Sequence, residues 1–330
     1  MAGLTPGMMR VVRHRGAGGR EVLAIDEVDR PEPGPDQVLV RVAAAGLNRA
    51  DVIQRRGQYP APPGWPPDIP GLEYVGVVAL CGPGVTRLQP GARVMGLVGG
   101  GAHAEYLVVH EREAMPVPAR LGDIEAAAIP EAFLTAYDAL VTRGRVAPGE
   151  RVLIHAVGSG VGTAAVQLAR WLGATVLGTS RTADKLFRAR ALGLDLGLDT
   201  SERSFREGLD APVDLILDFF GAGALADNLA SLALRGRLVL LGTMQGAEAE
   251  RVDLGRILRG RLEVIGTVMR SRPREERVAL ADEFTARVLP EIAAGRLAPI
   301  VGAVYPMTAI ADAHAAMEAN EVFGKIVLAW

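Results

Sequence analysis

The sequence predicts an α/β protein with two domains, one a β-barrel and the other a doubly wound parallel sheet. Its 330 residues suffice for two domains of about 150 residues, each large enough to bury a core. Short β-branched runs separated by Gly and Pro fill the first part of the chain, which is typical of an all-β barrel. Near-continuous apolar strands then alternate with helices, which indicates a buried parallel sheet.

Four short runs in the first part have the composition of strands: 37–48, 74–82, 92–98 and 104–109. Residues 55–72 contain too much proline for a helix or a central strand. We expect this segment to form an ordered loop over the barrel, because a proline-rich chain has little conformational entropy to lose when it folds.

The second part alternates strands and helices. The expected strands are 151–156, 175–180, 213–219, 237–243 and 262–268, and the expected helices are 160–173, 182–193, 222–234 and 274–294. In the first of these helices Val161, Ala165 and Leu168 fall on one face. The chain closes with a helix (308–319) and a strand (325–329), which pattern alone assigns to neither domain.

Composition excludes several classes of protein. The formal net charge is −2 and Cys81 is the single cysteine, so we expect no general attraction to nucleic acid or anionic lipid, no disulfide framework and no Cys₄ zinc site. No apolar run approaches the roughly 18 residues that span a membrane, and MAGLTPGMMR lacks the pattern of a signal peptide. We therefore expect a cytoplasmic protein without nucleic-acid or membrane partners.

Arginine greatly outnumbers lysine. The chain has 34 arginines and two lysines, Lys185 and Lys325. We attribute the arginine excess to codon bias, because thermophile proteomes favour Lys and Glu rather than Arg over Lys. The positions of the two lysines are therefore more informative than those of the arginines.

A glycine-rich turn, AVGSGVG (156–162), lies between an expected strand and an expected helix. Such a turn lets a dinucleotide pyrophosphate approach bare backbone at a helix N-terminus. The strict G-x-G-x-x-G spacing is not met, since Val157 and Ser159 occupy the places of the first two glycines. The context favours a dinucleotide site over a glycine-rich turn without a ligand. The cofactor-binding residues expected in this turn are Gly158, Ser159, Gly160, Val161 and Gly162.

The end of the next strand favours NADPH over NADH. Domains that bind NAD place Asp or Glu there for the ribose 2′-OH, whereas this chain reads GTSRTADK (178–185), without an acid at the strand end. Ser180, Arg181 and Lys185 could instead hydrogen-bond and neutralise a 2′-phosphate.

Further cofactor contacts are expected at the carboxyl ends of the later strands, where a doubly wound sheet binds its ligand. These candidates are Phe219, Leu241, Gly242, Thr243, Thr267 and Val268, together with Thr135 at the first helix of the domain. Most of them could equally be ordinary residues at the ends of a sheet.

The whole chain resembles the medium-chain dehydrogenase/reductase superfamily, within it the zinc-independent quinone oxidoreductase branch, and especially the p53-inducible type. Six segments carry this resemblance: GLNRADVIQRRGQYP (46–60), PGLEYVGVV (70–78), IHAVGSGVGTAAVQLA (154–169), LLGT (240–243), GTVMRSR (266–272) and GKIVL (324–328). Together they are specific, although no single one is.

The resemblance implies a GroES-like catalytic domain over 1–133 and 304–330, with a Rossmann NADP-binding domain inserted over 134–303. It thereby returns the last segment to the first domain. It also implies that Lys325 closes on the cofactor. Finally, it implies a homodimer formed through the edge of the Rossmann sheet at strand 262–268, which would cover an otherwise exposed edge.

Zinc members of the superfamily hold the metal through side chains that this chain lacks. The matching positions look like Asn48 and Leu72, and neither residue is a good ligand for Zn²⁺. The five histidines show no ligand spacing. We therefore expect no metal ion. The expected acceptors are compounds that accept hydride without a Lewis acid, namely quinones and conjugated enones.

The expected reaction is hydride transfer from NADPH to a quinone, in which negative charge develops on the acceptor oxygen. Asn48 and Tyr59 can donate a hydrogen bond to that oxygen, and Asp51 could orient them or join a proton route. By resemblance, Tyr59 holds the place of an active-site tyrosine. The competing interpretations are a structural Asn48, an N-cap Asp51 that opens a helix over 51–56, and a Tyr59 that packs the loop.

Two other functions remain open. The same motifs fit an NADPH-dependent enone or enoyl reductase, which only the pocket lining would distinguish. A nucleotide-binding protein of structural or RNA-binding function, with little catalysis, belongs to a different class, and the charge of −2 without a basic or aromatic patch argues against RNA.

Overall fold

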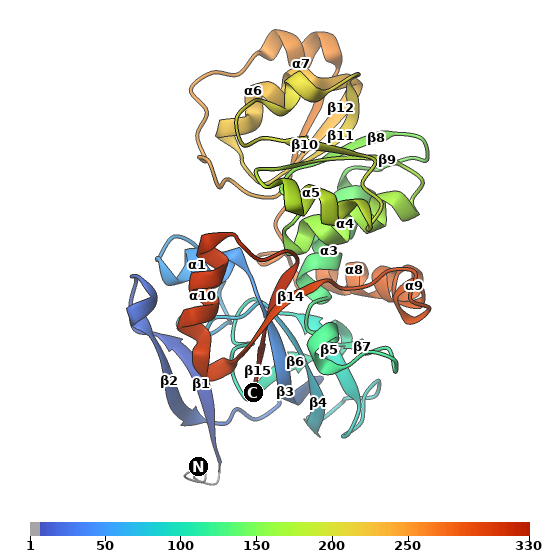
Figure 1. Ribbon diagram of the computed structural model, residues 1–330. Helices are drawn as coiled ribbons and strands as arrows, with labels where there is room; N and C mark the ends of the chain where they lie inside the picture. The colour runs from blue at the N-terminus through green and yellow to red at the C-terminus, as the bar shows by residue number, and fades with distance from the viewer. Residues whose placement is uncertain (1–6) are drawn as a thin grey trace. The chain divides into compact units, whose positions relative to one another are not determined.

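The computed structural model describes residues 7–330, which fold as two compact units (Figure 1). The first unit runs to Leu134 and resumes at Met269–Trp330, and the second is Thr135–Val268. The sequence-based limits were 1–133 with 304–330, and 134–303. The difference lies in residues 269–303, which we expected in the second domain and which group with the first unit.

Residues 269–303 group with the first unit because their long helix packs on it. Helix α8 (Arg274–Arg287) contacts the short helix η2 (Glu111–Glu113) and strand β7 (Met115–Pro116). The Arg277 guanidinium donates to Glu113 Oε1 at 2.7 Å across this contact. The sequence pattern identified a helix here, but a helical period does not say which core the helix covers.

The first unit contains a seven-stranded sheet in the order β14-β15-β3-β4-β5-β7, with β6 paired to β3. Its neighbours are antiparallel except for β14 and β15. Strands β1 and β2 form a separate antiparallel pair. The bounds are β1 Met8–His14, β2 Leu23–Asp29, β3 Gln37–Leu47, β4 Glu73–Cys81, β5 Arg93–Leu97, β6 Tyr106–His110, β14 Val301–Pro306 and β15 Lys325–Ala329.

The core of this unit joins the start of the chain to its end. Val38 and Val40 lie two residues apart on β3 and therefore face the same side of the sheet. They pack in one cluster with Ile326 and Leu328 of β15. Because β15 pairs with β3, the last strand of the chain is an integral part of the first unit.

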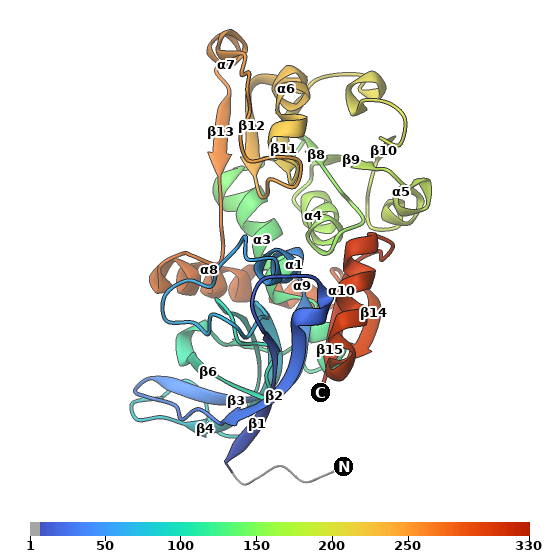
Figure 2. The same cartoon turned by 90° about the vertical axis from the view of Figure 1, so that its left-hand side faces the viewer.

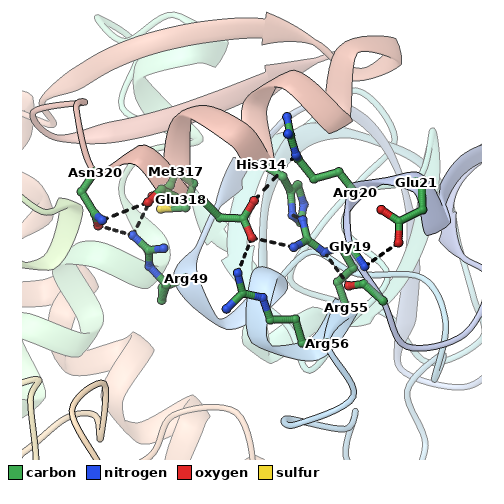
Figure 3. A network of polar contacts seen from close by, with 11 residues as sticks. Gly19, Arg20, Glu21, Arg49, Arg55, Arg56, His314, Met317, Glu318 and Asn320 are labelled. Carbon is green, nitrogen blue, oxygen red and sulfur yellow. Dashed lines mark hydrogen bonds and ion pairs between the residues drawn. The ribbon is translucent and has the colours of Figure 1, made fainter.

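Helix α1 (Arg49–Arg55) is tied to helix α10 (Ile310–Ala319) by a polar network around Glu318 (Figure 3). Arg55 and Arg56 each place Nη2 2.6 Å from Glu318 Oε1. Arg55 is almost fully buried, and its Nη1 lies 3.2 Å from His314 Nδ1. The network fixes the orientation of α1, which is preceded by Asn48 and carries Asp51.

The remaining helices of this part of the chain are short. They are α2 (Asp123–Ala126), α3 (Pro130–Tyr137), α9 (Leu289–Ala293), η1 (Arg20–Val22) and η5 (Met307–Ala309). The expected helix 274–294 is divided into α8 and α9, since Pro290 lacks the N–H that a continuous helix needs and instead lies in the first turn of α9.

The second unit is a six-stranded parallel sheet in the order β10-β9-β8-β11-β12-β13. The chain winds outward from β8 to β10 and then returns to continue from β11 to β13. The order therefore reverses between β8 and β11, where such sheets bind ligands. The strands are β8 Arg151–Ile154, β9 Thr175–Ser180, β10 Leu196–Asp199, β11 Val213–Asp218, β12 Leu232–Leu240 and β13 Glu263–Gly266.

Helices cover both faces of this sheet. Figure 2 shows α4 (Gly160–Trp171) and α5 (Ala183–Arg190) on one face, and α6 (Ala222–Ser231) and α7 (Leu254–Gly260) on the other. Short helices η3 (Asp138–Arg143) and η4 (Phe205–Gly208) complete the unit. Apolar strand residues such as Leu153, Leu177 and Ile216 are fully buried, as the continuous apolar runs predict.

Several elements differ from the sequence-based expectation. Strands β1, β2, β7, β10 and β14 were not anticipated, and the expected helix 222–234 ends at Ser231, where β12 begins. None of the helices in the part of the chain described here is both long enough and apolar enough to cross a membrane.

Candidate functional site

The glycine-rich turn joins β8 to α4 as a tight loop. Ala156 adopts a left-handed conformation with φ 49°, so the sharp bend is made by an alanine in a backbone region that L-residues rarely visit. Ser159 caps the helix, because its Oγ accepts the Gly162 N–H at 3.0 Å. The backbone N–H groups of the first turn, which includes Gly160 and Val161, point out of the helix N-terminus, where anions bind.

Two glycines of the turn have no room for a side chain. A Cβ on Gly162 would collide with the Ala156 carbonyl oxygen, and one on Gly158 would lie 2.6 Å from Cδ of Lys185. Gly162 therefore permits the tight bend, and Gly158 permits Lys185 to lie across it. This bare backbone at a helix N-terminus fits the pyrophosphate of a dinucleotide.

The expected phosphate-binding residues gather at the end of β9. Ser180 is buried and its Oγ accepts the Thr182 N–H at 3.1 Å. Arg181 is exposed and Lys185 is half-buried on α5. The structure thus brings Ser180 and Lys185 to the same end of the sheet as the glycine-rich turn, while the charged end of Arg181 is open to solvent.

The loops after β11 and β12 are hydrogen-bonded to each other. Asp218 is fully buried and accepts the N–H groups of Phe220 and Gly221, both at 2.9 Å. The backbone N–H of Met244 donates to the Phe219 carbonyl at 3.1 Å. The structure therefore places Phe219 and the segment Leu241, Gly242 and Thr243 at adjacent strand ends, as expected for residues around a cofactor.

The hydroxyl of Thr267 is engaged inside the second unit. Thr267 Oγ1 donates to Oδ2 of the buried Asp138 at 2.8 Å, so its hydroxyl holds η3. Thr135 is buried on α3. Val268, by contrast, is half-exposed.

The sequence did not single out His155 for a role in this unit. It is buried at the end of β8, with Nδ1 3.0 Å from Thr179 Oγ1 and Nε2 2.8 Å from Asn228 Oδ1. Burial lowers the pKa of His155, and a neutral imidazole suits these two neutral partners. Through these two contacts, His155 stabilises the chain directly before the glycine-rich turn.

The second candidate group lies in the first unit, around Asn48. Lys325 is buried, and its Nζ lies 2.6 Å from Asn48 Oδ1, 3.0 Å from the Leu47 carbonyl and 2.5 Å from Glu73 Oε1. Three acceptors match the three N–H donors of an ammonium group. We expected Lys325 at the cofactor, but in the structure its ammonium group binds Asn48, Leu47 and Glu73.

The Asn48 amide has one possible orientation, because only its oxygen can accept from Lys325. Its Nδ2 then donates to Glu73 Oε1 at 3.0 Å, and its other contact, to the Gly46 carbonyl, is 3.5 Å long. The amide is thus committed to internal partners. This arrangement favours the structural interpretation of Asn48 over donation to a substrate.

Asp51 is also fully engaged inside the unit. It is completely buried, its Oδ2 accepts the Asn48 N–H at 2.8 Å and its Oδ1 accepts the Gly71 N–H at 3.0 Å. Helix α1 begins at Arg49, with Asn48 as its N-cap residue, so the alternative in which Asp51 caps a helix over 51–56 is wrong. The carboxylate joins the start of α1 to the end of the proline-rich loop.

Tyr59 is the expected catalytic residue that remains partly exposed. Burial raises the pKa of its hydroxyl and the charge of Glu131 adds to this, while the charge of Arg270 lowers it. Two residues that the sequence did not single out support this region, Glu73 and Arg270. Glu73 is an acid within an otherwise apolar strand run, and that contrast was the signal that could have identified it.

Leu72, which by resemblance holds the place of a zinc ligand of the superfamily, is buried and apolar. Among residues 7–330, no three His, Cys, Asp or Glu side chains form a group that could hold a metal ion.

Comparison with known proteins agrees with this architecture. An alcohol dehydrogenase GroES-like domain family matches residues 34–119, and a zinc-binding dehydrogenase family matches residues 160–286. A quinone oxidoreductase from Lama guanicoe is 31% identical over 336 residues, which cover 97% of each chain. The pikromycin polyketide synthase component PikAII of Streptomyces venezuelae is 40% identical over 232 residues, which cover 67% of this chain and 6% of that protein.

Solved structures show the same fold over nearly the whole chain. An NAD-dependent alcohol dehydrogenase has a TM-score of 0.87 at 33% identity, covering 98% of this chain and 100% of its own. A Pseudomonas syringae quinone oxidoreductase (0.88, 29%) and mycobacterial Rv1454c complexed with NADPH (0.86, 29%) cover the same shares. The chain therefore belongs to the medium-chain dehydrogenase/reductase superfamily, in its quinone oxidoreductase branch.

Proposed function

We propose that the protein is an NADPH-dependent quinone reductase that works without zinc. The observation that carries the choice of cofactor is the end of β9, where Lys185 crosses Gly158 and no carboxylate takes the place that would bind a ribose 2′-OH. The solved relative in complex with NADPH supports this choice. When bound, the reduced nicotinamide supplies the hydride.

The residues at the zinc-ligand positions do not suit a metal. The Asn48 oxygen is 2.6 Å from the ammonium of Lys325, and a cation cannot share that oxygen without meeting a like charge. Leu72 has no ligating atom. We therefore infer a reaction in which the acceptor is polarised by hydrogen bonds rather than by a Lewis acid, which suits quinones and conjugated enones.

Within the first unit, Tyr59 is the side chain that we infer donates to the acceptor oxygen. It is partly exposed, whereas Asn48 and Asp51 are committed to internal hydrogen bonds. Those two residues, with Lys325 and Glu73, keep the start of α1 rigid. Tyr59→Phe should lower kcat/KM for a quinone by about a hundredfold, the usual effect of losing one donor to a developing oxyanion.

The alternative acceptor is an enone or enoyl substrate, and the polyketide synthase relatives favour it. Purified protein would be assayed for oxidation of NADPH and NADH against ortho-quinones, para-quinones and enones. A kcat/KM that is higher for NADPH and for quinones supports the proposal. Preference for NADH would refute the cofactor choice. Turnover of enones alone would mean that enones, and not quinones, are the acceptors.

A function without catalysis is tested in the same experiment. A gel shift with single-stranded RNA, with and without NADPH, would accompany the panel. If RNA displaced NADPH and no acceptor were reduced, the enzyme interpretation would fail.

A further inference from the structure

The guanidinium of Arg270 binds three separate segments of the first unit. Its Nε donates to the Gly99 carbonyl at 2.7 Å, its Nη1 to the Tyr59 carbonyl at 2.9 Å and its Nη2 to Gln54 Oε1 at 2.7 Å. The side chain is 4% exposed. Each of its three nitrogen atoms thus has a different partner, and the rigid plane of the group fixes those partners relative to one another.

The same guanidinium lies over the aromatic ring of Tyr59. Its central carbon is 4.9 Å from the ring centroid, within the range of a cation–π contact. Arg270 therefore holds both parts of Tyr59, the main chain through a hydrogen bond and the ring through its face.

Arg270 is also linked to the proline-rich loop at a second point, through Gln54. Gln54, which accepts from Arg270, donates through Nε2 to the Pro67 carbonyl at 3.2 Å. Trp65 packs against Gly99, where a Cβ would meet its ring. The proline-rich loop is thus attached at Tyr59 and at Pro67 to one buried pair, Arg270 and Gln54, and the Gly99 segment that Arg270 binds lies beneath Trp65.

The charge of Arg270 acts on the Tyr59 hydroxyl in a defined direction. Burial raises the pKa of this hydroxyl, the Glu131 carboxylate raises it further, and Arg270 lowers it. A phenol with a lower pKa is a stronger hydrogen-bond donor to an oxygen that gains negative charge. Arg270 thus partly offsets the weakening that burial imposes on this donor.

We propose that Arg270 is a positioning residue for the reaction: it fixes the ring and backbone of Tyr59 and strengthens the Tyr59 hydroxyl as a donor to the acceptor oxygen. The inference rests on the proposed function, in which Tyr59 is that donor. If Arg270 served the fold alone, its replacement would change activity equally with and without the Tyr59 hydroxyl. If Arg270 positions Tyr59, its replacement would matter only when that hydroxyl is present.

The test is a double-mutant cycle of Arg270→Met and Tyr59→Phe with the quinone that the panel identifies. Arg270→Met should lower kcat by about tenfold to a hundredfold, since a donor displaced by about 1 Å costs that much, with little change in KM for NADPH. In the Tyr59→Phe background it should cause almost no further loss, because the two residues act through one group. Equal losses in both backgrounds, or none in either, would overturn the proposal.

A second measurement does not depend on activity. Tyrosinate absorbance would be titrated in the wild type and in Tyr59→Phe, so that the difference reports Tyr59 alone. Arg270→Met should raise the pKa of Tyr59, and Arg270→Lys should raise it less, since lysine keeps the charge but not the three-way fork. An unchanged titration would refute the electrostatic part of the proposal.

The two measurements separate the proposal from the function on which it rests. If Tyr59→Phe left turnover intact while Arg270→Met still shifted the titration, the role of Tyr59 in the reaction would fail and its coupling to Arg270 would stand. Arg93→Met is the matched control. Arg93 lies in the same unit and donates through Nη2 to the Leu121 carbonyl at 3.0 Å and to Asp123, so its loss should leave kcat unchanged. A urea midpoint for each variant identifies any that fail to fold.

Discussion

The ammonium of Lys325 lies 2.6 Å from the side-chain oxygen of Asn48, although 277 residues separate them in the chain. The same ammonium is 2.5 Å from Glu73 Oε1, and both charged side chains are buried. The last strand of the chain thereby fixes Asn48, the N-cap residue of α1. A lysine placed here neutralises a carboxylate that would otherwise be buried without a countercharge.

Lys325→Met should destabilise the protein strongly. Removing one partner of a buried ion pair leaves an uncompensated charge and costs about 3–5 kcal/mol. Urea unfolding measures this as a lower midpoint. The double variant Lys325→Met with Glu73→Gln should unfold at a higher midpoint than Lys325→Met alone, because the uncompensated charge is gone. Equal midpoints for the single and double variants would show that the pair does not act as described.

Lys185→Gln should raise KM for NADPH by about tenfold and leave KM for NADH unchanged. The expectation follows from the loss of one charge-assisted hydrogen bond to a 2′-phosphate at a half-exposed site. The control is Arg188→Gln, on the same helix, whose guanidinium lies 3.9 Å from Asp184. Steady-state kinetics with both cofactors decides. If KM for NADPH and NADH rose together, Lys185 would not distinguish the two cofactors.

Sequence alone could predict the parts of the fold that depend on local patterns. The strand 175–180, the helix that starts at Gly160 and the glycine-rich turn between strand and helix were all foreseeable from residue periodicity and turn chemistry. The turn was identified by its context even though Ala156, rather than a glycine, takes the left-handed conformation.

Contacts distant in sequence could not be foreseen. The resemblance implied that Lys325 closes on the cofactor. A lysine in a closing segment gives no sign of its partner in another strand, so the contact of Lys325 with Asn48 could not be foreseen. Arg270 stood in a recognised motif, yet its three partners come from three separate segments. Helix 274–294 was foreseen as a helix, but a helical period does not show which core the helix covers.

Gly162→Ala should destabilise the second unit and weaken dinucleotide binding. The new methyl group would collide with the Ala156 carbonyl oxygen, and overpacking of this kind costs about 1–3 kcal/mol. Urea unfolding and NADPH fluorescence titration measure the two effects. Gly266→Ala is the matched control, since a Cβ there meets nothing within 4 Å. Equal effects of the two substitutions would contradict the steric argument.

The outer edge of β13 should pair with a second copy of the chain. β13 is the last strand of its sheet. Val264 on this strand is 43% exposed, and Val268, two residues past its end, is 48% exposed. An open strand edge with apolar side chains tends to be covered by another strand. Sedimentation should therefore give the mass of a dimer.

Val264→Arg tests this pairing, because two like charges would face each other across the dimer axis. The variant should sediment as a monomer. The control is Phe187→Arg, which introduces the same charge at another exposed apolar residue, 70% exposed on α5. This variant should remain dimeric. A wild-type protein that sediments as a monomer at micromolar concentration would contradict this prediction.

Stability should fall as the pH drops from 7 to 5, and His314 should account for part of the loss. Burial, with the charges of His103 and Arg55, lowers the pKa of His314 from 6.5 to about 3. Between these values the unfolded chain binds a proton that the folded chain does not, so acid favours unfolding. The stabilisation is complete above about pH 6.5 and is lost progressively below it. Burial lowers the pKa of His103 and His155 as well, so they act in the same direction.

His314→Gln removes one of these titrations. Between pH 6 and 5 the free energy of unfolding should fall by roughly 1 kcal/mol less in the variant than in the wild type, since one proton corresponds to about 1.4 kcal/mol per pH unit. Urea unfolding across this range measures the slope. The pKa values of the Glu150 and Glu318 carboxyl groups are lowered below 4.5. These two groups therefore titrate at more acidic pH than the range from 6 to 5, in which the histidines act. Identical slopes would mean that His314 is not held neutral in the folded protein.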